Sequence, residues 1–253
     1  MVTGGARGLG YAAAETLLAE GARVLISGPH ESSTKAALER LAGAGFGADR
    51  VAAIVADNAA DDAASRLVGE TAARFGRLDG AMLSFGGTPT GTVADTPDGA
   101  WRDAFESVFL GAVRLARALA PELEGAAGDG TDRSIAFVLA ASVRVPLPEL
   151  AISNGLFPGL AGVVKMLAEE LGPSGTRVNG LLPVRIATDR VREFDALSGD
   201  PDEVRLRRSL EIPLRRYGEP AEFGRVAAFV LSPAASYVTG AMIPVDGGSI
   251  RAI

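Results

Sequence analysis

The sequence contains no cysteine and a single histidine, His30, among its 253 residues. The absence of cysteine excludes disulfides, thiolate metal sites and a cysteine nucleophile. A single histidine excludes a multi-histidine metal site, and any catalytic triad would have to use His30 as its base. We therefore expect no metal in this protein.

Tyrosine and lysine are also scarce. The tyrosines are Tyr11, Tyr217 and Tyr237, and the lysines are Lys35 and Lys165. No tyrosine stands four residues before a lysine, so the chain contains no Tyr-x-x-x-Lys pair in any alignment.

Positive charge is in the minority. The net charge of −6 and the pI near 5.0 argue against a nucleic-acid or anionic-membrane partner. The chain shows no charged region followed by an apolar signal core, and we expect no apolar run long enough to cross a bilayer. The expected location is cytoplasmic.

A glycine-rich stretch opens the chain, since residues 3–10 read Thr-Gly-Gly-Ala-Arg-Gly-Leu-Gly. We predict that a strand ends at Thr3 and that a helix follows the turn. Glycines at 4, 8 and 10 allow a tight turn and close approach of a ligand, and the helix N-terminus would face an anion such as a pyrophosphate. The spacing differs from the common G-x-G-x-x-G fingerprint, so a βα turn without a ligand is the alternative.

Short apolar strands alternate with helices along the chain. Strands are predicted at 23–27, 51–55, 81–83, 135–139 and 177–182, and helices at 33–41, with Ser32 or Ser33 as cap, 61–75, 98–123 and 156–171. Repeated βα units with near-continuous apolar strands predict a parallel sheet covered on both faces, within one domain over residues 1–253. Only Met1 and Val2 precede Thr3, so we expect a short first strand or a native chain that begins upstream.

Ligands of such sheets bind outside the carboxyl ends of the strands. Asp57 follows a strand there and could accept a hydrogen bond from an adenine amino group, or only cap a helix. No acid follows the second strand, where an NAD site would hold the ribose 2′-hydroxyl; Gly28 and Pro29 stand there instead. Arg7 could pair with a 2′-phosphate or be solvated. The pattern favours NADP, with NAD as the alternative.

Several motifs together resemble the short-chain dehydrogenase/reductase family, and within it the members similar to 3-oxoacyl-carrier-protein reductases. They are the turn at 3–10, Ala56-Asp57, Leu78-Asp79, Ser142, R-V-N-G-L-L-P at 177–183 with Thr188-Asp189, I-P-L-R-R-Y-G-E-P-A-E at 212–222 and Y-V-T-G-A-M-I-P-V-D-G-G at 237–248.

The resemblance implies a Rossmann-type, doubly wound parallel sheet of seven strands with helices on both faces. It also implies a bound NAD(P), a homotetramer or homodimer, and a segment near 188–213 that covers the substrate. The cofactor-binding residues that it implies are Gly4, Ala6, Arg7, Gly8, Leu9, Gly10, Asp57, Asn58, Ser84, Gly86, Pro183, Ile186 and Thr188.

The catalytic positions depart from the family pattern of Asn, Ser, Tyr and Lys. Only Ser142 matches, because the Tyr and Lys positions fall at Ser153 and Phe157 and the Asn position at Val108. A serine hydroxyl is a far weaker acid than a tyrosine whose pKa of about 10 is lowered by a lysine cation. Losing a general acid typically costs about 10²–10⁴ in rate.

Three functions are compatible with these residues. One is an NADP(H)-dependent oxidoreductase with a non-standard active site, in which Ser142 and Ser153 polarise a carbonyl while water or substrate delivers the proton. Another is a redox-neutral cyclase, dehydratase or isomerase that uses Ser142, Ser153 and Asn154 as donors to an oxyanion. The third is a catalytically silent nucleotide-binding or partner-binding homologue. Ser153 and Asn154 could also merely cap a helix beginning near Leu156.

The substrate is predicted from residues near the site. Phe85, Leu147, Leu150, Leu156 and Phe157 predict an apolar pocket that favours a hydrophobic or aromatic small molecule or acyl group. Arginines in the covering segment could dock an acidic substrate or form a solvated, mixed-charge face. These arginines are Arg190, Arg192, Arg205, Arg207 and Arg208.

Overall fold

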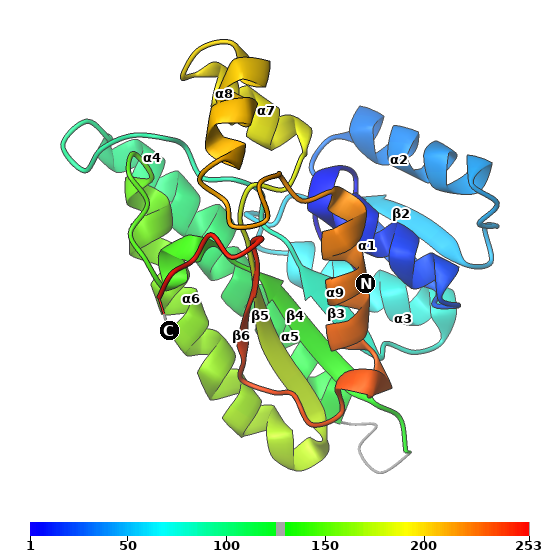
Figure 1. Ribbon diagram of the computed structural model, residues 1–253. Coiled ribbons are helices and arrows are strands. Elements are labelled where there is room, and N and C mark those ends of the chain that lie inside the picture. The colour runs from blue at the N-terminus through cyan, green and yellow to red at the C-terminus, as the bar shows by residue number, and fades with distance from the viewer. Residues whose placement is uncertain (125–129, 253) are drawn as a thin grey trace.

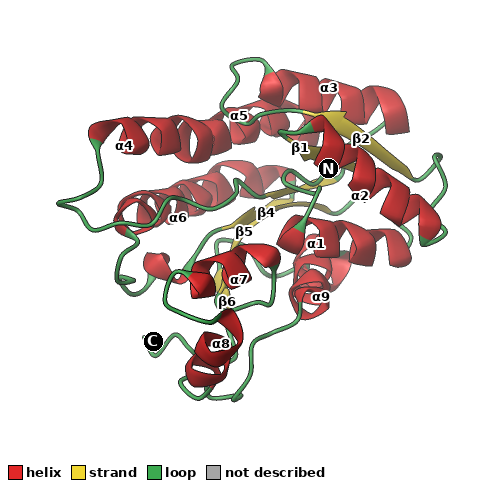
Figure 2. Ribbon diagram, turned by 90° about the horizontal axis from the view of Figure 1, so that it is seen from above, coloured by secondary structure: helices red, strands yellow, loops and turns green. Residues whose placement is uncertain are grey.

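The computed structural model describes residues 1–124 and 130–252. A parallel sheet runs through the molecule with helices on both faces (Figures 1 and 2). Its named strands are β1 (Val24–Gly28), β2 (Val51–Val55), β3 (Gly80–Leu83), β4 (Arg133–Val138), β5 (Thr176–Pro183) and β6 (Met242–Val245). Each pairing between them is parallel, which confirms the predicted α/β Rossmann-type architecture.

The first strand is reduced to a single bridging residue. Val2 pairs in parallel with Ile26 of β1 and with Met82 of β3. Its N–H donates to the Leu25 carbonyl at 2.8 Å, and the Thr3 N–H donates to the Met82 carbonyl at 3.0 Å. The sheet order is therefore β2, β1, Val2, β3, β4, β5, β6, and the order reverses at Val2, where doubly wound sheets bind their ligands.

Helices cover the two faces as separate layers, and a third group stands above the strand ends (Figure 1). The helices are α1 (Gly8–Ala19), α2 (Glu31–Gly43), α3 (Ala63–Phe75), α4 (Asp98–Ala104), α5 (Gly111–Glu124), α6 (Ala151–Leu171), α7 (Asp189–Ala196), α8 (Pro201–Ser209) and α9 (Pro220–Leu231). One core cluster joins the sheet to α3, α5 and α6, and the other joins it to α1, α2 and α9. Helices α7 and α8 lie above the carboxyl edge.

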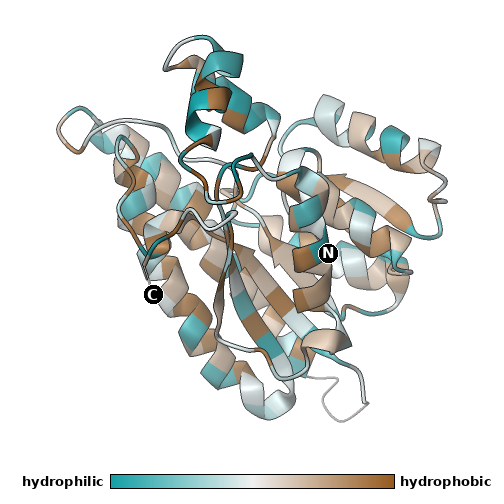
Figure 3. Ribbon diagram, viewed as in Figure 1, coloured by the Kyte–Doolittle hydropathy of each residue, from teal (hydrophilic) through white to brown (hydrophobic). Residues whose placement is uncertain are grey.

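The strands divide their side chains between these two clusters. Leu25, Leu83 and Phe137 point to the α3, α5 and α6 side, whereas their neighbours Ile26 and Met82 point to the other side. This alternation is the period of two expected of a strand buried on both faces. Burying each such side chain contributes roughly 1.5–3 kcal/mol to the stability of the fold. Figure 3 shows the resulting hydrophobic centre and the mostly hydrophilic α7 and α8.

Helix α2 and the predicted helix over 98–123 differ from their predictions. Helix α2 begins at Glu31 with His30 at the N-cap position and no side-chain cap bond, so the prediction that Ser32 or Ser33 caps it is wrong. The predicted helix over 98–123 consists of α4, the π-helical segment Phe105–Leu110 and α5. A π segment adds a residue to the turn and rotates the side chains around it, which periodicity alone does not reveal.

Helix α6 corrects the expectation that no apolar run is long enough to span a bilayer. Residues Ala151–Ser174 meet that condition by length and composition. In this fold, however, Leu160, Val164 and Leu171 belong to the core cluster against the sheet. A core helix acquires the same apolar composition as a membrane span, so a single such helix is weak support for one.

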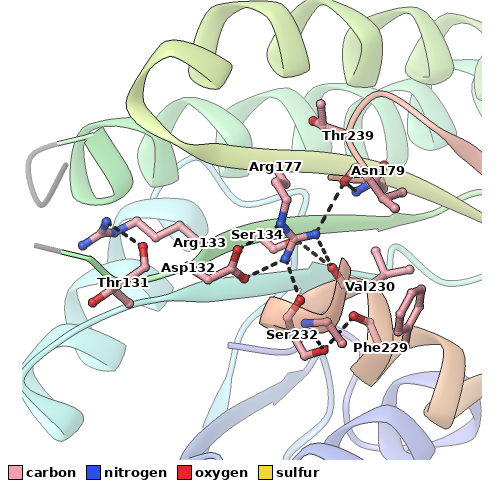
Figure 4. A network of polar contacts seen from close by, with 12 residues as sticks. Thr131, Asp132, Arg133, Ser134, Arg177, Asn179, Phe229, Val230, Ser232 and Thr239 are labelled. Carbon is pink, nitrogen blue, oxygen red and sulfur yellow. Dashed lines mark hydrogen bonds and ion pairs between the residues drawn. The ribbon is translucent and has the colours of Figure 1, made fainter. Parts of the chain in front are cut away.

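Arg177 ties β5 to the end of α9 (Figure 4). Its Nε and Nη2 donate to the two carboxylate oxygens of Asp132 at 3.0 and 2.7 Å, and its Nη1 donates to the Val230 carbonyl at 2.7 Å. Asn179 extends the network by donating to the Val238 carbonyl at 2.8 Å. Arg177 is 5% exposed, and a buried cation requires such pairing. The conspicuous Arg-Val-Asn motif thus has a structural role.

Candidate functional site

A cavity of about 420 Å³ opens at the carboxyl edge of the sheet, beneath α7. All thirteen residues to which the sequence resemblance assigned cofactor binding line this one cavity. They come from the turn before α1, the end of β2, the end of β3 and the segment after β5. Residues far apart in sequence are therefore brought together, and their role in binding a cofactor stays a prediction.

The glycine turn has a backbone that side chains would disturb. Gly4 and Gly8 have φ angles of +61° and +55°, in the left-handed region. A Cβ on Gly10 would lie 2.2 Å from the Gly4 carbonyl oxygen, because α1 packs directly on the turn. Helix α1 begins at Gly8, so its unpaired N–H groups lie at the cavity wall. This is the arrangement that binds a dinucleotide pyrophosphate.

Thr3 connects the glycine turn to the end of β3 by hydrogen bonds. Its hydroxyl donates to the Ser84 carbonyl at 3.0 Å and accepts from the Ser84 N–H at 2.8 Å. The Asn58 side chain donates to the same carbonyl at 3.4 Å. These hydrogen bonds connect the glycine turn and the segments after β2 and β3 around the cavity.

The end of β1 supplies no carboxylate to the lining. Pro29, His30 and Ser33 line the cavity there. Arg7 lines it from the turn, is exposed, and makes no ion pair within the described residues. Asp57 accepts the Ala59 N–H at 3.0 Å in a local turn, while α3 begins only at Ala63, so the alternative that Asp57 caps the next helix is wrong.

The two serines predicted to be catalytic face one another. Their hydroxyl oxygens are 3.0 Å apart, and the Ser142 hydroxyl also lies 3.2 Å from the Ser153 carbonyl oxygen. Ser142 is 5% exposed and Ser153 is 3% exposed. Neither residue is part of the cavity lining. The structure therefore pairs these two residues but does not place their hydroxyls on the cavity wall.

Asn154 has a well-defined structural partner. Its side chain accepts the Leu147 N–H and donates to the Leu147 carbonyl, both at 2.8 Å. Helix α6 begins at Ala151, with Leu150 at the N-cap position and no side-chain cap bond. The prediction of a helix starting near Leu156 with Ser153 or Asn154 as cap is therefore wrong, since both residues lie within its first turn. Asn154 instead holds the loop that follows Ser142.

Aromatic side chains form part of the cavity wall. Phe85 and Phe157 line the cavity, and Phe85 also packs on Phe137 with ring centres 6.3 Å apart. The leucines predicted to join this pocket, Leu147, Leu150 and Leu156, are not in its lining. Within the described residues the lining contains no tyrosine and no lysine. The described chain also offers no cluster of three potential metal-ligating side chains.

An ion pair connects the segment after β5 to α7 beside the cavity. Arg185 donates to Asp195 of α7 at 2.7 Å, and the Tyr217 hydroxyl donates to the other oxygen of the same carboxylate at 2.9 Å. Arg185 has φ of +50°, a conformation that costs a non-glycine residue roughly 1–3 kcal/mol and persists only where the surrounding structure holds it. Burial, reinforced by the bond to Asp195, raises the pKa of Tyr217 to about 12. The hydroxyl therefore keeps donating at neutral pH.

The sequence did not predict several polar residues of the lining, among them Ser33, Ser107, Arg185 and Arg190. Ser33 lies in the first turn of α2, beyond the end of β1. Ser107 lies in the π segment and precedes Val108, the position that the resemblance aligns with a catalytic asparagine. Arg190 was identified only as one of several charged residues of the covering segment. The positions of Ser33, Ser107 and Arg190 depend on helix geometry rather than on strand ends.

Comparison with known proteins gives full-length matches. Residues 4–249 match the family model described as enoyl-(acyl carrier protein) reductase. The short-chain reductase protein NovJ of Streptomyces niveus is 32% identical over 98% of this chain and 92% of its own length. L-rhamnose 1-dehydrogenase (NAD(P)(+)) of Azotobacter vinelandii is 32% identical over 98% and 94%. L-sorbose reductase from Gluconobacter frateurii, solved with NADPH and L-sorbose, has a TM-score of 0.90 and 26% identity over 100% and 96% of the two chains.

Proposed function

This chain belongs to the short-chain dehydrogenase/reductase family of oxidoreductases, and from that premise we propose that it uses NADP(H) in a non-standard active site. The proposed substrate is the carbonyl or hydroxyl group of a hydrophobic small molecule or acyl compound. The observation that carries the proposal is the convergence of thirteen predicted binding residues on one cavity. A Cβ at Gly10 would lie 2.2 Å from the Gly4 carbonyl oxygen, so the glycine at this position lets α1 pack closely on the turn, as in a dinucleotide-binding turn.

The preference for NADP rests on charge at the end of β1. Arg7 has a guanidinium without an ion-pair partner among the described residues, and no carboxylate stands where one would hold a ribose 2′-hydroxyl. Guanidinium groups pair well with phosphate. Among the similar solved proteins, the L-sorbose reductase is described with NADPH. These points support NADP, with NAD as the alternative.

The proposed chemistry assigns roles to residues of this chain. When bound, the nicotinamide coenzyme supplies or accepts the hydride. Phe85 and Phe157 keep water from the reacting carbon, and a dry site strengthens polar interactions with the carbonyl. Ser142 has to turn its hydroxyl from Ser153 toward the substrate oxygen in order to polarise it. Water or the substrate then delivers the proton, since no tyrosine lines the described cavity.

One observation favours a second candidate function. The Ser142–Ser153 pair is buried and satisfied by its own hydrogen bonds, outside the cavity lining. A redox-neutral cyclase, dehydratase or isomerase that uses the bound nucleotide structurally would be compatible with this arrangement, as would a catalytically silent nucleotide-binding protein. Both would bind the nucleotide without oxidising or reducing it.

The first experiment is a calorimetric titration with NADPH and, separately, with NADH. We expect NADPH to bind with a Kd in the micromolar range or below, roughly −8 kcal/mol or better, and more tightly than NADH. Arg7→Gln should remove the preference for NADPH, whereas Arg102→Gln, on an exposed part of α4, should not. If neither nucleotide binds at millimolar concentration, the oxidoreductase proposal is wrong.

A homotetramer or homodimer is also part of the proposal. Exposed apolar side chains lie on helices away from the cavity, with Met166 on α6 at 61% exposure and Phe229 on α9 at 46%. Covering such surfaces is the usual gain from symmetric association. Light scattering coupled to size-exclusion chromatography should give a mass of two or four chains. A monomer at micromolar concentration would contradict this part of the proposal.

A further inference from the structure

Arg190 lines the cavity and contacts the loop that follows β3. It lies in the first turn of α7, and its Nη2 donates to the Thr88 carbonyl at 2.8 Å. The guanidinium rests on Gly87, where an added Cβ would come within 2.7 Å of its Nε. Gly87 and Arg190 both line the cavity. The missing side chain at position 87 therefore makes the room in which the guanidinium lies.

Within the part of the chain that the structure describes, no ion pair compensates the charge of Arg190. A guanidinium has five N–H donors, and within the described chain Thr88 is the one hydrogen-bond acceptor that Arg190 meets. No carboxylate of the described residues pairs with it, whereas Arg185 and Arg192 in the same region pair with Asp195 and Asp202. The Thr88 bond holds the guanidinium in place and leaves its other donors for a ligand.

The position of Arg190 distinguishes it from the pyrophosphate site. Thr188 lies over the glycine turn, with its Cγ2 3.7 Å from where a Cβ of Gly8 would stand. Arg190, two residues later, reaches the opposite wall. Beyond that wall the loop after β3 continues into a second cavity of about 290 Å³, to which Asp95 and Glu149 contribute carboxylates. Arg190 thus contacts the loop after β3 and not the glycine turn.

We propose that Arg190 binds a carboxylate of the substrate, which narrows the substrate class to hydrophobic carbonyl or hydroxy compounds that also carry an acid group. This inference rests on the proposed function of the same cavity. The guanidinium fork matches a carboxylate bidentately. Asp95 and Glu149 disfavour an anion in the second cavity. Asp57 and Asp189 also line the first cavity, but neither pairs with Arg190, so its guanidinium is the group that would bind the acid. Phe85 and Phe157 accommodate the apolar remainder of the molecule.

Phenylpyruvate and phenylacetone test the proposal, because they share a benzyl ketone and differ in that a carboxylate replaces a methyl group. Each is titrated into the wild-type protein with and without saturating NADPH. We expect phenylpyruvate to bind roughly 10- to 100-fold more tightly, the effect of a charge-assisted hydrogen bond. Arg190→Gln should remove this preference and leave the Kd for NADPH unchanged. Arg192→Gln, on the same helix and paired with Asp202, should keep it.

Other outcomes separate the possible failures. If Arg190→Gln weakens NADPH binding and leaves the phenylpyruvate preference intact, the anion bound by Arg190 is a coenzyme phosphate and the proposal is wrong. Equal binding of the two ketones, or no binding of phenylpyruvate, also overturns it. If NADPH fails to bind while the preference persists in nucleotide-free protein, the proposed function fails but the Arg190 assignment stands. If Arg190→Gln does not fold, Gly87→Val is the alternative variant. It keeps the charge of Arg190 but displaces the guanidinium, and we expect it to reduce the preference for phenylpyruvate over phenylacetone.

Discussion

Replacing Ser153 by tyrosine and Phe157 by lysine in one protein is expected to raise the rate of ketone reduction about 10²–10⁴-fold, the usual contribution of a general acid. The two positions are one helical turn apart on α6, so their side chains share a face. Phe157 already lines the cavity, so a lysine there would extend into it. A lysine cation beside the new tyrosine would lower its pKa and make it a competent proton donor.

The measurement is NADPH oxidation with a panel of hydrophobic ketones at saturating nucleotide. Ser153→Phe combined with Phe157→Lys is the matched control, since it adds the same ring and cation without the hydroxyl, and it should gain nothing. Both variants should have wild-type circular dichroism and bind NADPH. If the folded Tyr/Lys variant reduces no ketone faster than the wild type, the missing proton donor is not what limits the rate of ketone reduction.

Replacing Gly10 by alanine is expected to lower NADPH affinity at least 100-fold, or about 2.7 kcal/mol. The new Cβ would stand 2.2 Å from the Gly4 carbonyl oxygen and 2.6 Å from its carbonyl carbon. Neither atom belongs to a flexible side chain, so the turn itself must move away from α1. That movement displaces the N–H groups of the helix N-terminus from the phosphate position, and overpacking of this kind also destabilises the fold by roughly 1–3 kcal/mol.

The control for this prediction is Gly162→Ala in the interior of α6, where an added Cβ meets nothing within 4 Å. It should stabilise the protein by about 0.5–1 kcal/mol, the ordinary gain of alanine over glycine in a helix, with NADPH affinity unchanged. Calorimetry and thermal unfolding measure both effects. Gly8→Ala, at a φ of +55° without a close contact, provides a milder variant should Gly10→Ala not fold. Wild-type NADPH affinity in Gly10→Ala would contradict the assignment of the turn.

The strands and the glycine turn could be predicted because their signals are local. Five predicted strands are observed with bounds within two residues, and family membership predicted from the combined motifs is confirmed. Helix starts were less predictable. Helices α2 and α6 begin before their expected caps, because packing against the sheet stabilises a first turn that lacks a capping side chain.

The sequence by itself determined the α/β class, the position of the glycine turn and the absence of a Tyr-x-x-x-Lys pair, since each depends on residue identity and short-range spacing. Only the tertiary structure decided that Val2 bridges β1 and β3, that Ser142 faces Ser153, and that Arg190 reaches Thr88. Such pairings join residues that lie up to 102 positions apart. Hydrophobic periodicity indicates which face of an element is buried, but the polar atom that each side chain meets depends on how distant elements pack together.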